Sequence, residues 1–304
     1  MDVKSKALFY RTAQIICCLF WALFAQNAFS GPESRAVLHP QGLLWKIQKN
    51  NQPPSYLFGT IHISDSRVIQ LLDVVQTALQ ETDVFAMEVI LDQHAQIAIS
   101  RASFFSDDEL LEDYIDTLQL DRINQIMYQY YGINPEIVNR MKPWAVMATI
   151  SSPPPESNKT VLDIQLQSLA SEYDHPVFGL ETVAEQVEAL SGMTRAEQLW
   201  LLNKSVDDFE KNMGLLERMI ESYLKRDLQG LIQEQAELMD DKSSIDDRFM
   251  EKLLDQRNLK MAERMIAIMK NKSVFVAIGA LHLPGKKGVL HLLEKAGYQV
   301  EKIY

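Results

Sequence analysis

Short apolar runs that end in a histidine or a glutamate constrain the fold of this 304-residue chain more than any other feature. Four runs share this form: FGTIH carries His62, FAMEV carries Glu88, FGLET carries Glu181 and IGALH carries His282. Each run has the length and apolar character of a buried strand, and helical periodicity fills the stretches between them. In open α/β sheets, ligands bind beyond the carboxyl ends of the parallel strands. Two histidines and two carboxylates at four such ends therefore predict one shared site.

The periodicity of the whole chain predicts an α/β fold with a central, mainly parallel sheet flanked by helices and a large helical insertion in the middle of the chain. Strands are predicted at 43–48, 56–60, 83–90, 175–182, 273–278 and 298–303. Helices are predicted at 107–131, 135–150, 160–173, 247–270 and 289–296. A further helix, which Ser64 or Asp65 would cap, is expected directly after His62.

The first thirty residues have the composition of a secretory signal peptide. A basic start precedes an apolar run over 15–25, and small residues allow cleavage after Ser30. The apolar run is shorter than the ~20 residues that span a bilayer, and an uncleaved anchor is the alternative. We therefore expect a secreted or periplasmic protein in which 31–304 form a single domain with no stable membrane span.

Composition and motifs exclude several kinds of site and partner for the mature chain. Both cysteines, Cys17 and Cys18, lie in the predicted signal, so no disulfide, thiolate metal site or cysteine nucleophile is expected. Removal of 1–30 would take away three basic residues and one acidic residue and move the net charge from −11 to −13. Such acidity argues against nucleic acid and anionic membranes as partners. No HExxH helix motif, phosphate-binding glycine loop or GxSxG elbow is present, and no pattern specifies an oligomeric state.

Two charges fall at positions that are predicted to be buried. Glu88 interrupts an apolar strand and needs a cation, an arginine or a metal to be stable there. Arg257 lies within the apolar stripe of helix 247–270, next to Asn258, and needs an acceptor such as Glu88 or Glu181. The alternatives are a purely structural salt bridge for Glu88 and an arginine that extends to the helix edge. Glu181 also precedes a predicted helix, where an acid is favourable with or without a function.

The same segments resemble the TraB/GumN family. The resemblance lies in FGTIH, Glu88 after a strand, GLET, Arg257-Asn258 and the closing GALHLPGKKGVLHLLEKAGYQVEKI, and it covers about 43–303. This family is related to the Tiki metalloproteases and, more distantly, to erythromycin-esterase and haem-binding ChaN-like proteins. The resemblance implies a site of His62, His282 and Glu88, with Glu181, Arg257 and Asn258 in support. In the Tiki branch it implies metal-dependent peptide cleavage with manganese or cobalt.

The residues favour a metal-dependent hydrolase, and the resemblance implies that it is peptidase-like and acts on a peptide or small-molecule substrate. His62, His282 and Glu88 would bind a divalent manganese, cobalt, zinc or iron ion, which would activate water. Glu88 or Glu181 would ligate the metal or act as general base, and Arg257 would hold a carboxylate or an oxyanion.

One feature counts against a metal: predicted helix N-termini just beyond His62 and Glu181 favour anions. Two alternatives are therefore kept. The first is a metal-independent, esterase-type hydrolase in which a glutamate polarises a histidine. The second is a non-catalytic protein that holds metal or haem through the same histidines.

Overall fold

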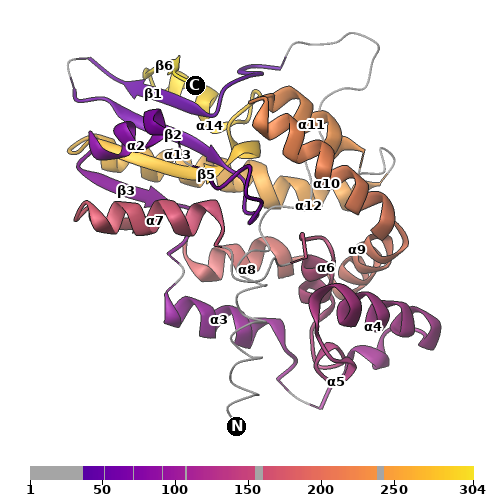
Figure 1. Cartoon of the computed structure of the whole chain (residues 1–304). Coiled ribbons are helices and arrows are strands. Elements are labelled where there is room, and N and C mark those ends of the chain that lie inside the picture. The colour runs from indigo at the N-terminus through magenta and orange to yellow at the C-terminus, as the bar shows by residue number, and fades with distance from the viewer. Residues whose placement is uncertain are drawn as a thin grey trace. The chain divides into compact units, whose positions relative to one another are not determined.

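The computed structural model describes residues 37–50, 52–70, 72–90, 92–106, 108–154, 160–237 and 243–304, in two compact units (Figure 1). With those gaps, the helical unit comprises 92–154 and 183–216, and the sheet unit comprises 37–90, 160–182 and 217–304. The predicted signal peptide, 1–30, lies outside the described residues. The assignment of 31–304 to a single domain stays a prediction.

The sheet unit is built on one six-stranded sheet in the order β4-β3-β5-β2-β1-β6. The strands are β1 (Leu44–Gln48), β2 (Ser55–Thr60), β3 (Val84–Met87), β4 (Val177–Gly179), β5 (Val274–Gly279) and β6 (Gln299–Lys302). β4, β3, β5 and β2 are parallel neighbours, whereas β1 runs antiparallel to both β2 and β6. The prediction of a mainly parallel sheet is therefore confirmed.

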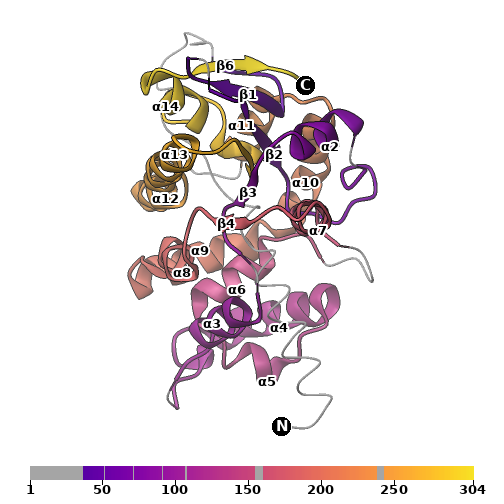
Figure 2. The ribbon, with the colours of Figure 1, turned by 90° about the vertical axis from the view of Figure 1, so that its left-hand side faces the viewer.

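Helices cover both faces of this sheet (Figure 2). α2 (Asp73–Gln80) and α7 (Leu162–Glu172) lie on one face, and α13 (Gln256–Met269) and α14 (Val289–Lys295) lie on the other. The chain moves one way across the sheet from β2 through β3 to β4 and then returns through β5 to β6. Because crossovers between parallel strands are right-handed, this reversal places the outgoing and returning helices on opposite faces. The α/β class is confirmed, and the reversal lies beside β5, the position at which ligands bind in open α/β sheets.

The central strands form the core of the sheet unit. All residues of β3 (VFAM) and β5 (VFVAIG) are buried. A strand covered on both faces has no solvent side, so its sequence is continuously apolar instead of alternating. The rings of Phe85 and Phe275 stack with their centroids 6.1 Å apart, which joins the two strands on one face.

Residues 63–70 contain a turn and no helix, so the prediction that a helix starts directly after His62 was wrong. α2 begins only at Asp73. Asp65 does not cap a helix; its carboxylate accepts the backbone N–H of Arg67 at 2.8 Å and also binds the Arg67 guanidinium. An aspartate that bonds the backbone two residues ahead favours a turn over a helix start.

Two other predicted helices contain breaks, and a third changes its helical type. Segment 107–131 forms a short 3₁₀ turn, η1 (Leu111–Asp113), and α4 (Thr117–Tyr131). Segment 135–150 forms α5 (Pro135–Val138) and α6 (Pro143–Ile150), because a proline disfavours helical conformation in the residue before it. Segment 247–270 is continuous, but a π-helical turn, η2 (Glu251–Asp255), separates α12 (Ser244–Met250) from α13.

The remaining helices complete the predicted insertion. They are α3 (Gln93–Ser103), α8 (Val183–Ser191), α9 (Arg195–Asp207), α10 (Phe209–Leu224) and α11 (Leu228–Ala236). Every residue of α6 is buried, and α6 packs against α9 to form the centre of the helical unit. Within the described ranges, none of the helices combines the length and the apolar character needed to cross a bilayer.

Candidate active site

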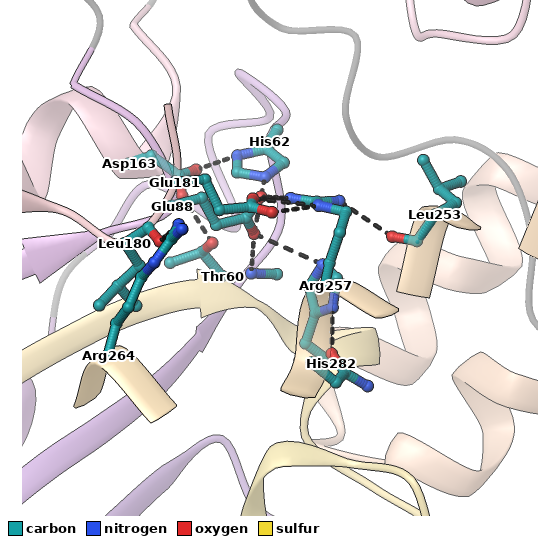
Figure 3. A network of polar contacts seen from close by, with 12 residues as sticks. Thr60, His62, Glu88, Asp163, Leu180, Glu181, Leu253, Arg257, Arg264 and His282 are labelled. Carbon is teal, nitrogen blue, oxygen red and sulfur yellow. Dashed lines mark hydrogen bonds and ion pairs between the residues drawn. The ribbon is translucent and has the colours of Figure 1, made fainter. Parts of the chain in front are cut away.

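The candidate site lies at the carboxyl ends of the four parallel strands (Figure 3). β2 ends two residues before His62, β3 ends directly before Glu88, and β4 ends two residues before Glu181. After β5, the short 3₁₀ helix η3 (Ala280–His282) carries His282. All six residues singled out in the sequence come together here, and all belong to the sheet unit. Their catalytic and metal-binding roles stay a prediction.

The two imidazoles approach the same carboxylate oxygen. His62 Nε2 lies 3.8 Å from Glu88 Oε1, and His282 Nε2 lies 3.7 Å from that oxygen. Both separations exceed a hydrogen bond. His62 Nε2 is buried and has no hydrogen-bond partner. A buried ring nitrogen in that state is a costly arrangement unless another group bonds to it.

A carboxylate orients His62. Asp163 Oδ2 lies 2.6 Å from His62 Nδ1, and Asp163 Oδ1 accepts a hydrogen bond from Thr60 Oγ1 at 2.6 Å. Because an ionised carboxylate only accepts hydrogen bonds, the proton of this contact belongs to Nδ1. In the neutral ring, the lone pair therefore lies on Nε2, the atom that faces Glu88.

An amide orients His282 in the same way. Asn258 Oδ1 lies 2.6 Å from His282 Nδ1, and Asn258 Nδ2 donates to the carbonyl of Lys287 at 3.0 Å. The bond to Lys287 decides which end of the amide is the oxygen, so Oδ1 accepts the proton of His282 Nδ1. Both rings therefore carry a proton on Nδ1. The charged carboxylate of Asp163 orients the ring of His62, whereas the neutral amide of Asn258 orients the ring of His282.

Arg257 joins the two glutamates. Its Nη2 donates to Glu88 Oε2 and to Glu181 Oε2, each at 2.6 Å, while Nε donates to Glu181 at 2.9 Å. Its Nη1 donates to the carbonyl of Leu253 at 3.1 Å, in the π-helical turn that precedes it. The guanidinium is therefore buried between both predicted acceptors and does not extend to the helix edge. π-helical turns inside α-helices are frequent at functional sites.

Glu88 is ionised in this environment. Burial acts to raise its pKa, but the positive charges of Arg257 and of the nearby His62 hold that pKa well below the usual range. The backbone N–H of Gly279 adds a hydrogen bond of 2.7 Å to Oε1. Glu88 thus presents a negative oxygen between the two imidazoles.

The two histidines have opposite electrostatic surroundings. For His62, burial acts to lower the pKa, but the charge and hydrogen bond of Asp163, followed by the negative charge of Glu88, raise it to about 10. For His282, burial and the positive charges of Arg257 and His62 outweigh Glu88 and lower the pKa to about 3. With no metal ion bound, the site therefore holds a protonated His62 and a neutral His282.

Asp163 and Thr60 are site residues that the sequence reasoning missed. A signal was present for Asp163, because it lies on the buried face of α7 with Leu162, Leu166 and Ala170. An acid on the apolar face of a helix is the same kind of oddity that singled out Arg257. Thr60 offered no such signal, since a threonine in a strand is ordinary.

Gly59 brings the two histidine segments close together. A Cβ atom at Gly59 would lie 3.1 Å from both Cα and Cβ of Ala280 and 3.1 Å from Leu283 Cδ2. A side chain there would require these atoms to move by a few tenths of an ångström, so the glycine favours the close packing of β2 against η3. The glycine of the first GxxH motif therefore serves a close approach of two backbone segments.

The donor atoms do not form a ready-made metal cage. Among the described residues, no group of three or more His, Cys, Asp and Glu side chains has the arrangement needed to hold a metal ion. The physical reason lies in Glu88, because Arg257 and Gly279 already occupy one position on each of its oxygens.

Fold and site together define an α/β protein with a buried pair of oriented histidines around one carboxylate. The chain belongs to the TraB/PrgY/gumN family, whose model matches residues 43–302, and the resemblance in the sequence is thereby confirmed. No solved structure matches it significantly.

Curated relatives of this chain are named metalloproteases. Metalloprotease TIKI1 of Danio rerio is 26% identical over 309 residues, which cover 85% of this chain and 62% of the relative. Metalloprotease TIKI2 of Xenopus tropicalis is 26% identical over 89% of this chain and 61% of its own length. Human metalloprotease TIKI1 is 26% identical over 95% of this chain and 68% of its own. The chain thus spans about three-fifths of the length of the first two relatives.

Proposed function

We propose that this protein is a metal-dependent hydrolase of the peptidase type. The observation that carries the proposal is the approach of two Nε2 atoms, from His62 and His282, to the same oxygen of Glu88. Two imidazoles and a carboxylate are a common donor set of catalytic zinc and of other divalent metals. The names of the TIKI relatives support the same reaction class.

The chemistry of the site suits a divalent cation held by His62, His282 and Glu88. His62 Nε2 is buried without a partner, while Asp163 and Asn258 occupy the Nδ1 atoms, as is usual for histidines that bind metals. A bound metal would acidify a water molecule and polarise the scissile carbonyl. The helix N-terminus expected beside His62 is not found over 63–70, whereas α8 does begin two residues after Glu181, so the electrostatic argument against a cation applies at Glu181 and not at His62.

The remaining residues then have distinct roles. Arg257 neutralises Glu88 and Glu181 and keeps Glu88 Oε1 turned toward the imidazoles. Both oxygens of Glu181 accept from Arg257, so this glutamate anchors the guanidinium, and Glu88 is the better candidate for ligand or general base. Asn258 fixes the orientation of His282.

Removal of metal is expected to abolish hydrolysis. The purified protein would be dialysed against a chelator and then assayed with a library of internally quenched peptides, beside elemental analysis of the same sample. Manganese, cobalt, zinc and iron(II) would be added back separately. Activity should disappear with the metal and return with at least one ion. Full activity in a sample shown to be free of metal would exclude this mechanism.

Metal affinity is expected to rise with pH. The pKa of His62 is raised to about 10, so below that pH a metal must displace a proton from His62, whereas His282, with a pKa of about 3, carries none. One displaced proton predicts an apparent affinity that increases roughly tenfold per pH unit between pH 7 and 9. Manganese(II) is the suitable probe, because the water bound to it keeps its proton in this range. A slope of zero would contradict the prediction.

A metal-independent hydrolase is the second candidate. The observation that favours it is the contact of 2.6 Å between His62 and Asp163, together with the hydrogen bonds that Arg257 and Gly279 already make to the two oxygens of Glu88. A histidine paired with a carboxylate can activate water without a metal. Hydrolysis of simple esters by the metal-free sample, lost in His62→Ala, would favour this candidate over the first.

We also propose that the chain is exported and cleaved after Ser30. The support is the basic start, apolar run and small residues of 1–30. Intact-mass measurement of protein from the producing cells should show a chain that begins at Gly31. A mature protein that retains Met1 would contradict the proposal.

A further inference from the structure

We propose that Asp163 is a positioning residue that holds the His62 ring with its Nδ1 proton bound and its Nε2 atom facing Glu88. This role rests on the proposed function only in giving Nε2 its purpose, as a metal ligand or a base. Asp163 would not touch the substrate or the reacting atoms itself.

The contacts of Asp163 carry this inference. Its side chain is buried, and it is used at both oxygens, by His62 Nδ1 and by Thr60 Oγ1, each at 2.6 Å. Thr60 ends β2, two residues before His62, whereas Asp163 lies in the first turn of α7. Asp163 therefore makes two hydrogen bonds from α7 to the end of β2, one to Thr60 and one to His62. Together they restrain the position and the rotation of the His62 ring.

A structural role alone does not account for this geometry. A carboxylate that only joined α7 to β2 could do so through Thr60, and it would not need to fix the orientation of an imidazole. The bond to Nδ1 instead leaves the buried Nε2 of His62 directed at the second carboxylate, with no partner of its own. The pairing of His282 with Asn258 has the same geometry but no charge, so the chain contains its own reference for the effect of the carboxylate.

Three substitutions separate the effect of the Asp163 charge on His62 from the effect of its position. Asp163→Asn keeps the shape and one acceptor oxygen, Asp163→Ala removes both oxygens, and Thr60→Val removes the donor that orients the carboxylate. Loss of an outer partner of a metal-binding histidine typically costs 10- to 100-fold in metal affinity. We expect manganese(II) affinity, corrected for proton competition at His62, to fall about tenfold for Asp163→Asn and about 100-fold for Asp163→Ala, with Thr60→Val less affected than either.

A second readout needs no metal. In the full-length protein, an imidazole N–H that donates to a buried carboxylate should give a far-downfield proton NMR signal, and its loss in His62→Ala would assign it to His62. The signal should disappear in Asp163→Ala, shift in Asp163→Asn and remain in Thr60→Val. Asn258→Asp, a charge change at the other ring, should leave it in place. Thermal unfolding would establish that each variant is folded, and the isosteric Asp163→Asn keeps the test open if Asp163→Ala is not.

The two readouts distinguish failure of this inference from failure of the proposed function. A wild-type protein that binds no metal but shows the expected NMR changes would leave the positioning role intact and remove the metalloenzyme. A His62 signal that persists in Asp163→Ala, or metal affinity equal to wild type in both Asp163 variants, would overturn the positioning role.

Discussion

Replacement of either His62 or His282 by alanine is expected to abolish hydrolysis while the protein still folds. Each substitution removes one of the two imidazoles that approach Glu88 Oε1, and the remaining pair of groups cannot hold a divalent ion tightly. Because loss of a mere outer partner already costs up to 100-fold in affinity, we expect kcat/KM and metal affinity to fall by more than about a hundredfold. Peptide turnover and elemental analysis of the same preparations would measure both quantities.

A matched control is available in His94. This residue is exposed on α3, and His94→Ala should retain wild-type turnover and metal content. Circular dichroism and thermal unfolding would show that the His62 and His282 variants remain folded. Full activity of either variant would mean that the two rings do not serve one reaction, whatever their separation.

The strand ends were predictable from the sequence because their signals are local. A short apolar run followed by a histidine or a glutamate defines both the buried strand and the polar exit, and the parallel order needs only the helices between the runs. Asp163 was not predictable in this way. It pairs with a histidine 101 positions away, and nothing near it in the chain indicates that partner.

The ranking of the two glutamates depends on strand order, which the local pattern does not contain. Glu88 and Glu181 occupy equivalent positions, each just beyond a strand. In the sheet, however, β3 is the direct neighbour of β5, whereas β4 lies at the edge. Glu88 is therefore placed beside β5, whose end precedes His282, and Arg257 links Glu181 to Glu88.

The predicted helix boundaries were wrong where a local polar bond or a proline determined the backbone conformation. Asp65 bonds to Arg67 and forms a turn where the apolar spacing indicated a helix. Pro143 separates α5 from α6 within one apolar pattern. These errors also affected the functional argument, because the helix expected after His62 was the reason to disfavour a cation there.

Replacement of Arg257 by methionine is expected to cause the largest loss of stability of any single change in the site. The side chains of Glu88 and Glu181 are at most 5% exposed, and each bonds to this guanidinium. Methionine fills similar volume but leaves both carboxylates buried without their cation. Breaking a buried ion pair in this way typically costs about 3–5 kcal/mol in the free energy of unfolding, which urea denaturation would measure.

The pH dependence of this loss gives a more specific test. In the wild type, Arg257 holds the pKa of Glu88 below its value in the unfolded chain, so the resulting stability is present at neutral pH and lost only in acid. In Arg257→Met, burial dominates and raises the pKa of Glu88. Lowering the pH then protonates the buried carboxylate and removes the free-energy cost of its charge. The deficit of the variant relative to wild type should therefore be smaller at pH 5 than at pH 8.

Arg67→Met is the matched control for Arg257→Met. Arg67 also pairs with two carboxylates, Asp65 and Glu217, but it does so at the surface, where water and salt screen the charges. Its substitution should hardly change the free energy of unfolding at either pH. If Arg257→Met cost no more than Arg67→Met, the guanidinium would not be what keeps Glu88 ionised, and Glu88 would lack the charge on which the proposed metal binding and catalysis depend.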